Sequence, residues 1–296
     1  MFKVNAVAFS CAIALTSAAF GQTWVSSTGN DSNTCTRTSP CATFQRAINL
    51  TGAWGEVHVV DAGQYGAATI SEPMTIDGGG FATTLIGSGT AFSVNAPNGA
   101  VVQVRNLSIH GEGAAQTGIS YNSGSQLIIE NVKVNGFGGN CIVAGIAGSG
   151  TADLVIKDSS IDNCSSAGVY INNSETITVS ILNSHVHFAN LGVYAYVGHI
   201  TISGSSFSSP GYGTNTWGIY LPTGGVATVL VDNSVFSGYA YAGYIVAGTL
   251  QLNRSTFTNN TTALIGGASA TIISNGNNSF FNNGSIGTIN QTVSLQ

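Results

Sequence analysis

Short apolar segments recur along the chain between about residues 100 and 280, and each alternates apolar with polar positions. A period of two is typical of a β-strand that buries one face. The segments end on apolar anchor residues spaced 21 to 29 positions apart: Ile109, Val134, Ile161, Val186, Phe207, Phe236, Phe257 and Phe280. A repeat of this length is too short for two packed helices, so it predicts a solenoid in which every coil is built of strands.

Aligned on these anchors, the segments form columns of equivalent positions. The columns seven and five positions before the anchor are apolar and are expected to point inward. The first of them contains Val102, Leu127, Leu154, Val179, Ile200, Val229, Leu250 and Ile273. The column two positions before the anchor becomes serine at Ser159, Ser184, Ser205, Ser234 and Ser255. We expect these serines to face inward too, with stacked hydroxyls bonded to one another.

The column three positions before the anchor is mostly asparagine. Its members are Asn106, Asn131, Asp158, Asn183, Gly204, Asn233, Arg254 and Asn277. Asn tolerates the left-handed backbone conformation, so we expect the chain to turn here in every coil. A side-chain amide can also bond its copy about 4.8 Å away on the next coil. We interpret this column as a structural ladder.

The N-terminus has the pattern of a secretory leader. Lys3 precedes an apolar stretch over residues 6–20, and Gly21 is a small residue suited to signal peptidase. We assign residues 1–21 to a signal peptide cleaved near Gly21, which predicts an extracellular or periplasmic protein. The apolar stretch is too short for a permanent membrane span, and no span is expected elsewhere.

Cys11 lies in this leader, which leaves four cysteines, an even number that suggests two disulfides in an exported chain. Cys35 and Cys41 are close in sequence and are expected to close a small loop. Cys141 and Cys164 each precede a recurrent glycine, Gly145 or Gly168, by four positions. We therefore predict that they stack in phase on adjacent coils. Since a strand separation of about 4.8 Å lies within the Cα range of a disulfide, we predict a Cys141–Cys164 bond.

The chain divides into an N-terminal segment and the solenoid. Residues 22–53 are expected to form a strand, the disulfide loop and a short capping helix, with Ser39 as N-cap and Pro40 at the first helical position. Cys41, Phe44 and the apolar pair 47–48 fall on one face of this helix, which can cover the open end of the solenoid. Residues 54–296 are expected to form the solenoid itself.

The pattern predicts an all-β fold, a right-handed parallel β-helix of about ten turns. Three motifs, Trp24-Val-Ser-Ser-Thr-Gly29, Ser39-Pro-Cys-Ala-Thr-Phe44 and Met74-Thr-Ile-Asp-Gly-Gly-Gly80, followed by repeats with Asn turns, resemble the entry of secreted bacterial right-handed parallel β-helix proteins. These belong to the pectate-lyase-like superfamily. The resemblance implies the fold over essentially the whole mature chain. It implies no single activity, because that fold hosts lyases, hydrolases, epimerases, adhesins and phage spikes.

Tyrosines recur on the outer face of one strand column. Each coil has a strand that begins at a recurrent glycine, and two positions later lie Tyr170, Tyr194 and Tyr220, with Ser120, Ala147 and Ile245 in the other coils. Tyr196 shares this face, and Trp217, Tyr212, Tyr239 and Tyr241 are expected in flanking loops. Amphipathic rings suit the C–H faces of sugars, and the strand resembles the one that lines the superfamily's substrate cleft. The alternative is an aromatic ladder that only stiffens the sheet.

Ionisable side chains flank the anchors on another outer face. His110, Lys133, Asp162 and His187 fall on four successive coils, with His185 beside them. An imidazole next to a carboxylate can act as acid and base, so His110, Asp162 and His187 are the candidate catalytic residues, with Lys133 as a candidate base. The alternative is a set of scattered solvated groups. Arg105, Glu130 and Lys157 are expected to form a surface ion ladder, and Asp77 to be a turn residue.

The composition of the chain restricts the classes of molecule that it is expected to bind. Only 6% of residues are charged, and the net charge of −5 argues against nucleic acid, which needs a basic surface. Motifs of polygalacturonases and alginate epimerases are missing, as are a phosphate loop and zinc-ligand spacing, so no cofactor or metal is expected. The preferred hypothesis is an exported protein that binds an extracellular, neutral polysaccharide. The alternatives are a polysaccharide lyase or glycoside hydrolase of unrecognised type, and a structural or adhesive rod that self-associates.

Overall fold

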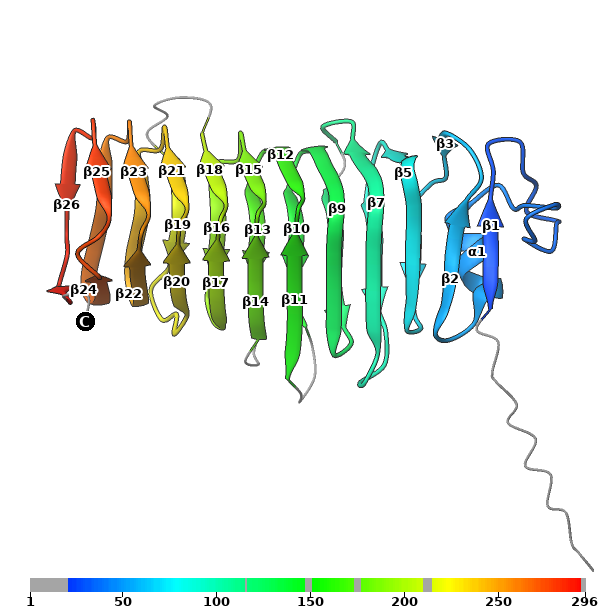
Figure 1. The fold of residues 1–296 in the computed structure, drawn as a ribbon, viewed down its shortest axis with the longest axis horizontal. Helices are drawn as coiled ribbons and strands as arrows, with labels where there is room; N and C mark the ends of the chain where they lie inside the picture. Colours follow the sequence, from blue (N-terminus) through cyan, green and yellow to red (C-terminus); the bar gives the residue numbers. More distant parts are fainter. Residues whose placement is uncertain (1–20, 115, 147–150, 173–176, 210–214, 294–296) are drawn as a thin grey trace, which may run out of the picture.

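Parallel strands stack into one elongated solenoid in the computed structural model (Figure 1). The structure describes residues 21–293 apart from residues 115, 147–150, 173–176 and 210–214. The predicted signal peptide therefore lies outside the described residues, except for Gly21. The all-β parallel solenoid is confirmed. Its regular part, between Met74 and Gly266, contains about eight coils, so the expected ten is slightly too many because that count included irregular coils at both ends.

The strands form three parallel sheets that run along the solenoid axis. Sheet 1 contains β1 (Gln22–Val25), β2 (Gly55–Val59), the first halves of β5 (Met74–Ile86), β7 (Val101–Gly111) and β9 (Gln126–Phe137), then β11 (Ala152–Lys157), β14 (Ile177–Leu182), β17 (His199–Ser203), β20 (Thr228–Asp232), the second halves of β22 (Tyr241–Asn253) and β24 (Thr262–Ser274), and β27 (Gln291–Thr292). Each long strand bends from one sheet into the next.

The other two sheets complete every coil. Sheet 2 contains β3 (Gly63–Gln64), the second halves of β5, β7 and β9, then β12 (Ser160–Cys164), β15 (His185–His187), β18 (Ser206–Ser208), β21 (Val235–Ser237), β23 (Thr256–Thr258) and β25 (Ser279–Phe281). Sheet 3 contains β4 (Ala68–Ile70), β6 (Thr90–Asn95), β8 (Thr117–Ser123), β10 (Asn140–Ala144), β13 (Ala167–Ile171), β16 (Leu191–Ala195), β19 (Trp217–Leu221), the first halves of β22 and β24, and β26 (Ser285–Gly287).

The predicted apolar columns form the core. Leu154 pairs with Leu127 and Val179, and the register continues without a slip to Leu250. All of these side chains are buried. The last coil differs, because Leu250 pairs with Ile272 and not with Ile273. Ile272 is buried and Ile273 is half-buried, so the alignment was one residue off where the repeat becomes irregular.

The asparagine column turns the chain as predicted. Seven of its eight residues have φ between +46° and +60°: Asn106, Asn131, Asp158, Asn183, Gly204, Asn233 and Arg254. In the last coil the left-handed residue is Gly276, with φ of +76°, and not the expected Asn277. The amide ladder forms at its start, where Asn131 Nδ2 donates to Asn106 Oδ1 at 2.9 Å and Asn106 Nδ2 donates to Asp77 Oδ1 at 3.0 Å. The turn between sheets 1 and 2 is therefore fixed by backbone preference and by side-chain bonds between coils.

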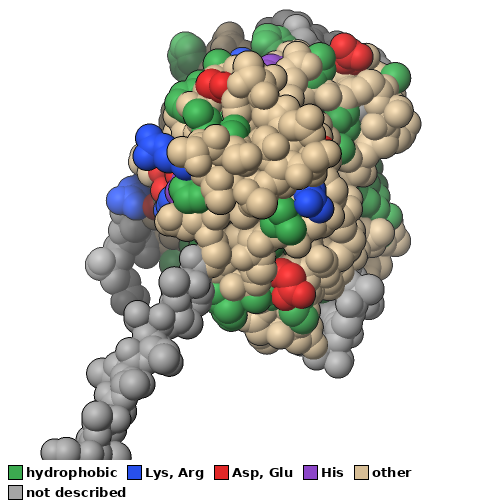
Figure 2. Space-filling view, turned by 90° about the vertical axis from the view of Figure 1, so that its right-hand side faces the viewer, with side chains coloured by type: hydrophobic (Ala, Val, Ile, Leu, Met, Phe, Trp, Pro, Cys, Tyr) green, Lys and Arg blue, Asp and Glu red, His purple; other side chains and the backbone are tan. Residues whose placement is uncertain are grey.

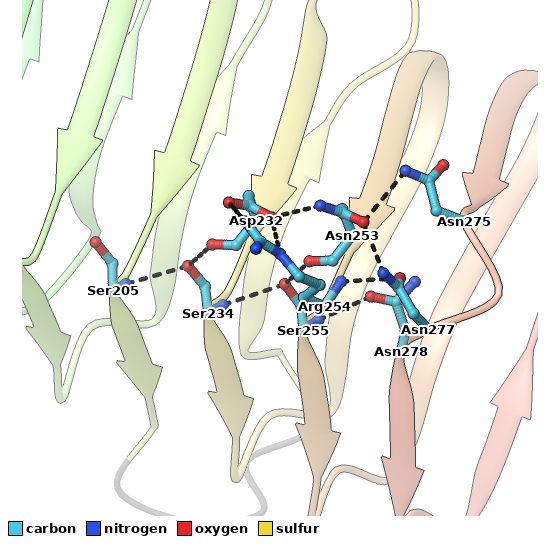
Figure 3. Close-up of polar contacts among 9 residues, drawn as sticks. All are labelled: Ser205, Asp232, Ser234, Asn253, Arg254, Ser255, Asn275, Asn277 and Asn278. Carbon is cyan, nitrogen blue, oxygen red and sulfur yellow. Dashed lines mark hydrogen bonds and ion pairs between the residues drawn. The ribbon is translucent and has the colours of Figure 1, made fainter. Parts of the chain in front are cut away.

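The serine column is buried, but its hydroxyls do not bond one another as expected. The backbone N–H of Ser205 donates to Ser234 Oγ, and that of Ser234 donates to Ser255 Oγ, each at 3.1 Å (Figure 3). Each hydroxyl then donates to the carbonyl two residues earlier, as Ser234 does to Asp232. At the last coil the Asn278 side chain replaces the hydroxyl and accepts from Ser255 N. Each serine thus satisfies an interior amide that the turn leaves without a strand partner.

Both predicted disulfides are present, although the argument for one of them was wrong. Cys35 bonds Cys41, and Cys141 bonds Cys164 with a Cα–Cα distance of 5.6 Å. The two central cysteines are not stacked in phase: Ile142 pairs with Val169, whereas Cys164 pairs with Phe137. Gly145 is therefore not equivalent to Gly168, and the disulfide joins β10 of sheet 3 to β12 of sheet 2.

A helix, α1 (Phe44–Thr51), covers the N-terminal end of the core. It begins later than expected, because Thr43 and not Ser39 is the N-cap; Thr43 Oγ1 accepts from Arg46 N. Asp31 holds the preceding segment outside the helix by accepting from the amides of Ala42 and Thr43. The buried Phe44 ring packs on Tyr65 and Phe92. Seen from this end, the surface carries few charged side chains (Figure 2).

Candidate functional site

Four tyrosines occupy one column on the outer face of sheet 3. Tyr170 of β13 pairs with Tyr194 of β16, which pairs with Tyr220 of β19, which pairs with Tyr244 of β22. Each side chain is half-buried, while its neighbours on the strand point into the core. The alternation of strand side chains thus places three of the predicted binding residues on successive coils, and it adds Tyr244.

The rings contact one another along the axis. Centroid distances are 4.9 Å from Tyr194 to both Tyr170 and Tyr220, and 5.5 Å from Tyr220 to Tyr244. Tyr196 joins at 5.2 Å from Tyr194, with their hydroxyls 2.8 Å apart. Trp217 lies 4.5 Å from Tyr220, and Tyr241 lies 5.4 Å from Tyr244. We call this set the aromatic strip: Tyr170, Tyr194, Tyr196, Trp217, Tyr220, Tyr241 and Tyr244.

The structure corrects several positions of the strip. Ile219 pairs with Gly243, so Gly243 is not the equivalent of Gly218, and Tyr244 takes the outward position expected of Ile245, which is buried. In the coil before Tyr170, the outward position next to this tyrosine is occupied by Val143. Residue 147, which was expected there, lies outside the described residues, and so does residue 212, which was expected in a flanking loop. Trp217 and Tyr241 lie on strands and not in loops. Tyr239 is fully buried and does not belong to the strip.

The electrostatics of the strip are those of neutral hydroxyls. Burial raises the pKa of Tyr170, Tyr194 and Tyr220 above the usual tyrosine range, and the nearby tyrosine hydroxyls add to the shift. The strand segments that present the strip, 167–171, 191–195, 217–221 and 241–245, contain no Asp, Glu, Lys, Arg or His. The strip therefore offers hydrogen-bond donors and acceptors beside apolar ring surface, without a formal charge.

The second predicted cluster lies on the outer face of sheet 2, and the structure brings only part of it together. Asp162 Oδ1 lies 3.8 Å from His187 Nδ1, and Asp162 Oδ2 accepts a bond of 2.6 Å from Ser160 Oγ. Ser206, which the sequence reasoning missed, bonds His187 Nε2 at 3.2 Å and His185 Nδ1 at 2.7 Å. The signal was available, because Ser206 continues the column of Ser160 and His185 one position before the anchor.

His110 and Lys133 do not belong to this group. His110 pairs with Asn135, and Asn135 pairs with Asp162, so two coil steps separate His110 from the carboxylate. Burial, together with the charge of Lys133, lowers the pKa of His110 and favours its neutral form. Lys133 is exposed and lines an open groove of about 420 Å³ that also reaches Ser160 and His185. The four predicted catalytic residues therefore lie in two places.

A family model described as a right-handed β-helix region matches residues 46–207. The chain belongs to this family. The crystal structure of pectate lyase Pel9A is similar to this β-helix protein with a TM-score of 0.54 and 14% sequence identity, over 87% of this chain and 78% of that one. No curated protein sequence matches. The structural likeness shows a shared fold.

The residues predicted to form a surface ion ladder, and Asp77, have structural contacts. Lys157 pairs with Glu130 at 2.9 Å, as the predicted ion ladder requires. Arg105 instead turns toward the N-terminal coils and pairs with Glu56 at 2.6 Å and Asp77 at 2.9 Å. Asp77 is a turn residue as expected, since it also accepts from Gly79 N. The predicted three-member ladder is therefore only half formed.

The part of the β-helix that the structure describes has neither a metal-ligand cluster nor a membrane-spanning helix. Within it, no three His, Cys, Asp or Glu side chains lie close enough together to hold a metal ion. None of its helices is long and apolar enough to cross a membrane.

Proposed function

We propose that this β-helix protein is exported and binds a neutral extracellular polysaccharide along the aromatic strip. The observation that carries the proposal is the register that stacks Tyr170, Tyr194, Tyr220 and Tyr244 on one uncharged outer face. A contiguous strip of half-exposed aromatic side chains on an outer face is a feature that binding surfaces often have. The two disulfides fit an oxidising compartment, as the leader-like N-terminus does.

The geometry fits a long, repetitive ligand better than a small one. One tyrosine is presented per coil, at the strand spacing of about 4.8 Å, so the strip repeats at roughly the scale of one sugar unit. Because the tyrosine rings lean on one another, they offer edges and hydroxyls, whereas Trp217 and Tyr196 flank the column. Sugar C–H groups can pack on the rings and sugar hydroxyls can exchange bonds with the phenols.

The charge of the chain and of the aromatic strip is the reason for proposing a neutral polysaccharide. The mature chain is acidic overall, and the strip has no cation to pair with a uronate. An anionic polysaccharide would lose hydration on this surface without gaining an ion pair. A neutral β-glucan, xylan or galactomannan avoids that cost. The strip therefore favours neutral chains through hydrogen bonding and apolar contact alone.

Affinity electrophoresis through gels containing these three neutral polysaccharides tests the proposal. We expect retardation by at least one of them, and a roughly tenfold weaker affinity for Tyr194→Ala, since this ring contacts Tyr170, Tyr196 and Tyr220. Loss of one stacking ring in a binding surface is worth on the order of 1 kcal/mol. Tyr194→Phe, which keeps the ring, should lose less.

A matched control is Trp24→Ala, because Trp24 is also a stacked surface aromatic, on His58 of sheet 1. Its mobility should equal that of the unmodified chain in every gel. If no neutral polysaccharide retards the protein, or if Tyr194→Ala is retarded as strongly as the original, the strip is only a stiffening ladder. Concentration-dependent assembly in light scattering, with no retardation, would favour the structural or adhesive rod.

A further inference from the structure

Asp162, His187 and Ser206 form a chain of contacts that the binding proposal does not use. The three residues lie on consecutive strands of sheet 2, because β12 pairs with β15 and β15 with β18. His187 is placed between the other two, with Nδ1 3.8 Å from Asp162 Oδ1 and Nε2 3.2 Å from Ser206 Oγ. This is the order of groups by which an imidazole base activates a serine hydroxyl.

The contacts are compatible with the arrangement of protons that this activation requires. Ser206 Oγ contacts His185 Nδ1 at 2.7 Å as well as His187 Nε2. If His185 donates to the oxygen, the Ser206 proton points at His187 Nε2, which must then be the unprotonated nitrogen. The proton of His187 is left on Nδ1, facing the Asp162 carboxylate. Asp162 is itself buried and held by Ser160, so its carboxyl group has a fixed position behind the base.

We propose that Ser206 is a nucleophile that takes an acyl group from carboxylic esters, with His187 as its general base and Asp162 as a positioning residue. An open groove is lined by Ser160 and by His185, whose ring contacts Ser206 Oγ, and this groove can hold the remainder of an ester. Nothing in this inference depends on glycan binding, because the aromatic strip lies on sheet 3 and Ser206 on sheet 2.

The reaction balances without a cofactor. Ser206 Oγ attacks the ester carbonyl while its proton moves to His187 Nε2, and the tetrahedral adduct collapses as the ester C–O bond breaks and His187 protonates the departing alcohol. Water then attacks the acyl-serine, gives one proton to His187 and releases a carboxylic acid. That proton returns to Ser206 Oγ. The net change is ester plus water to acid plus alcohol.

The surroundings predict a slow reaction. The Ser206 backbone N–H donates to Ser184 O at 3.0 Å, so it is not free to stabilise an oxyanion. The donor next to the reacting atom is the exposed His185 ring. A site that lacks a second oxyanion donor loses on the order of a hundredfold in rate. Covalent labelling of the serine is therefore a more sensitive readout than turnover.

The experiment is labelling of the full chain with an alkyl fluorophosphonate, read by peptide mass spectrometry. We expect one phosphonyl group, on the peptide that contains Ser206, and none there in Ser206→Ala. His187→Ala should label about a hundredfold more slowly and recover in part when imidazole is added. His187→Gln replaces it if the alanine variant does not fold, as judged by circular dichroism.

Two further variants separate a chemical role from a structural one. Ser208→Ala lies two residues along the same strand and outer face, and it should label like the original chain. Asp162→Asn should label more slowly, and Asp162→Glu should recover part of that rate, since a carboxylate at this position holds the His187 ring in place. Labelling that falls on another serine, is lost in Ser208→Ala, is unchanged in His187→Ala or does not occur at Ser206 at all overturns the proposal.

Discussion

At the residue scale, backbone conformation explains which side chains the turns accept. The turn between sheets 1 and 2 follows the Asn preference for positive φ, and this was predictable from the column of asparagines. A second left-handed column, two positions after the anchors, was not predicted. It contains Gly136, Asn163, Phe188, Gly238, Asn259 and Asn282. Phe188 is the exception to the Gly and Asn chemistry of this second column, with φ of +55° and 51% of its surface exposed.

Phe188→Asn should therefore stabilise the protein. A left-handed residue with a bulky side chain costs about 1–2 kcal/mol, and Asn avoids much of that cost. We expect the free energy of unfolding to rise by about 1 kcal/mol in chemical denaturation. Phe281→Asn is the matched control, because Phe281 is 70% exposed but is not among the left-handed residues. A Phe188→Asn chain that is no more stable would mean that this ring makes compensating contacts.

At the element scale, the repeat predicted strands, sheets and inward columns because apolar periodicity reflects burial directly. The predicted register between coils was wrong where a single residue type, the recurrent glycine, was used to align them. Cys141 occupies the place of the glycine in its coil, and Ala242 does so in another, so Gly145 and Gly243 were aligned wrongly. The same misalignment affected the prediction of the aromatic strip. The correctly aligned coils predicted Tyr170, Tyr194 and Tyr220, whereas Tyr244 was missed because its coil was misaligned. Contacts between columns, such as Ser206 with two histidines, depend on rotamers that periodicity does not encode.

In the N-terminal coil, a set of hydrogen bonds to the carboxylate of Asp61 makes stability depend on pH. Asp61 accepts bonds of 2.7 Å from Ser26 Oγ, Ser27 N and the hydroxyl of the buried Tyr65. These donors, the Ser27 amide first, hold the pKa of Asp61 below its usual value of 3.8. A lowered pKa stabilises the fold at pH values above the unfolded-state pKa of about 3.9, and this stabilisation is lost as pH falls through the folded-state pKa.

Asp61→Asn should accordingly be less stable than the original chain at pH 6, with a difference in thermal midpoint that shrinks as the pH is lowered from 5 to 2. Differential scanning fluorimetry at each pH measures it. Glu72→Gln, at an exposed position near the same end, should show no such pH-dependent difference. A gap between Asp61→Asn and the original that stays constant over this range would contradict an electrostatic role for Asp61.

At the scale of the whole molecule, stability is a sum of contacts between neighbouring coils. Each strand that the structure describes pairs with the equivalent strands of adjacent coils, and none of these strands links distant parts of the solenoid. The two disulfides differ in their positions. Cys35–Cys41 spans 6 residues near the capped end, whereas Cys141–Cys164 spans 23 residues and joins two sheets in the middle. The central bond is the one that can limit how an opening spreads from coil to coil.

Replacing Cys141 and Cys164 together by alanine tests this. In the chain-entropy model a 23-residue loop is worth about 3 kcal/mol, against about 2 kcal/mol for the N-terminal loop. Because coils communicate only with their neighbours, the loss should appear in the amides of β9 to β13, whose opening free energy falls in hydrogen exchange, and should fade by β20 to β24. Replacing Cys35 and Cys41 should instead affect β1 and α1. Equal loss of protection along the entire chain would show that the solenoid opens as a single cooperative unit.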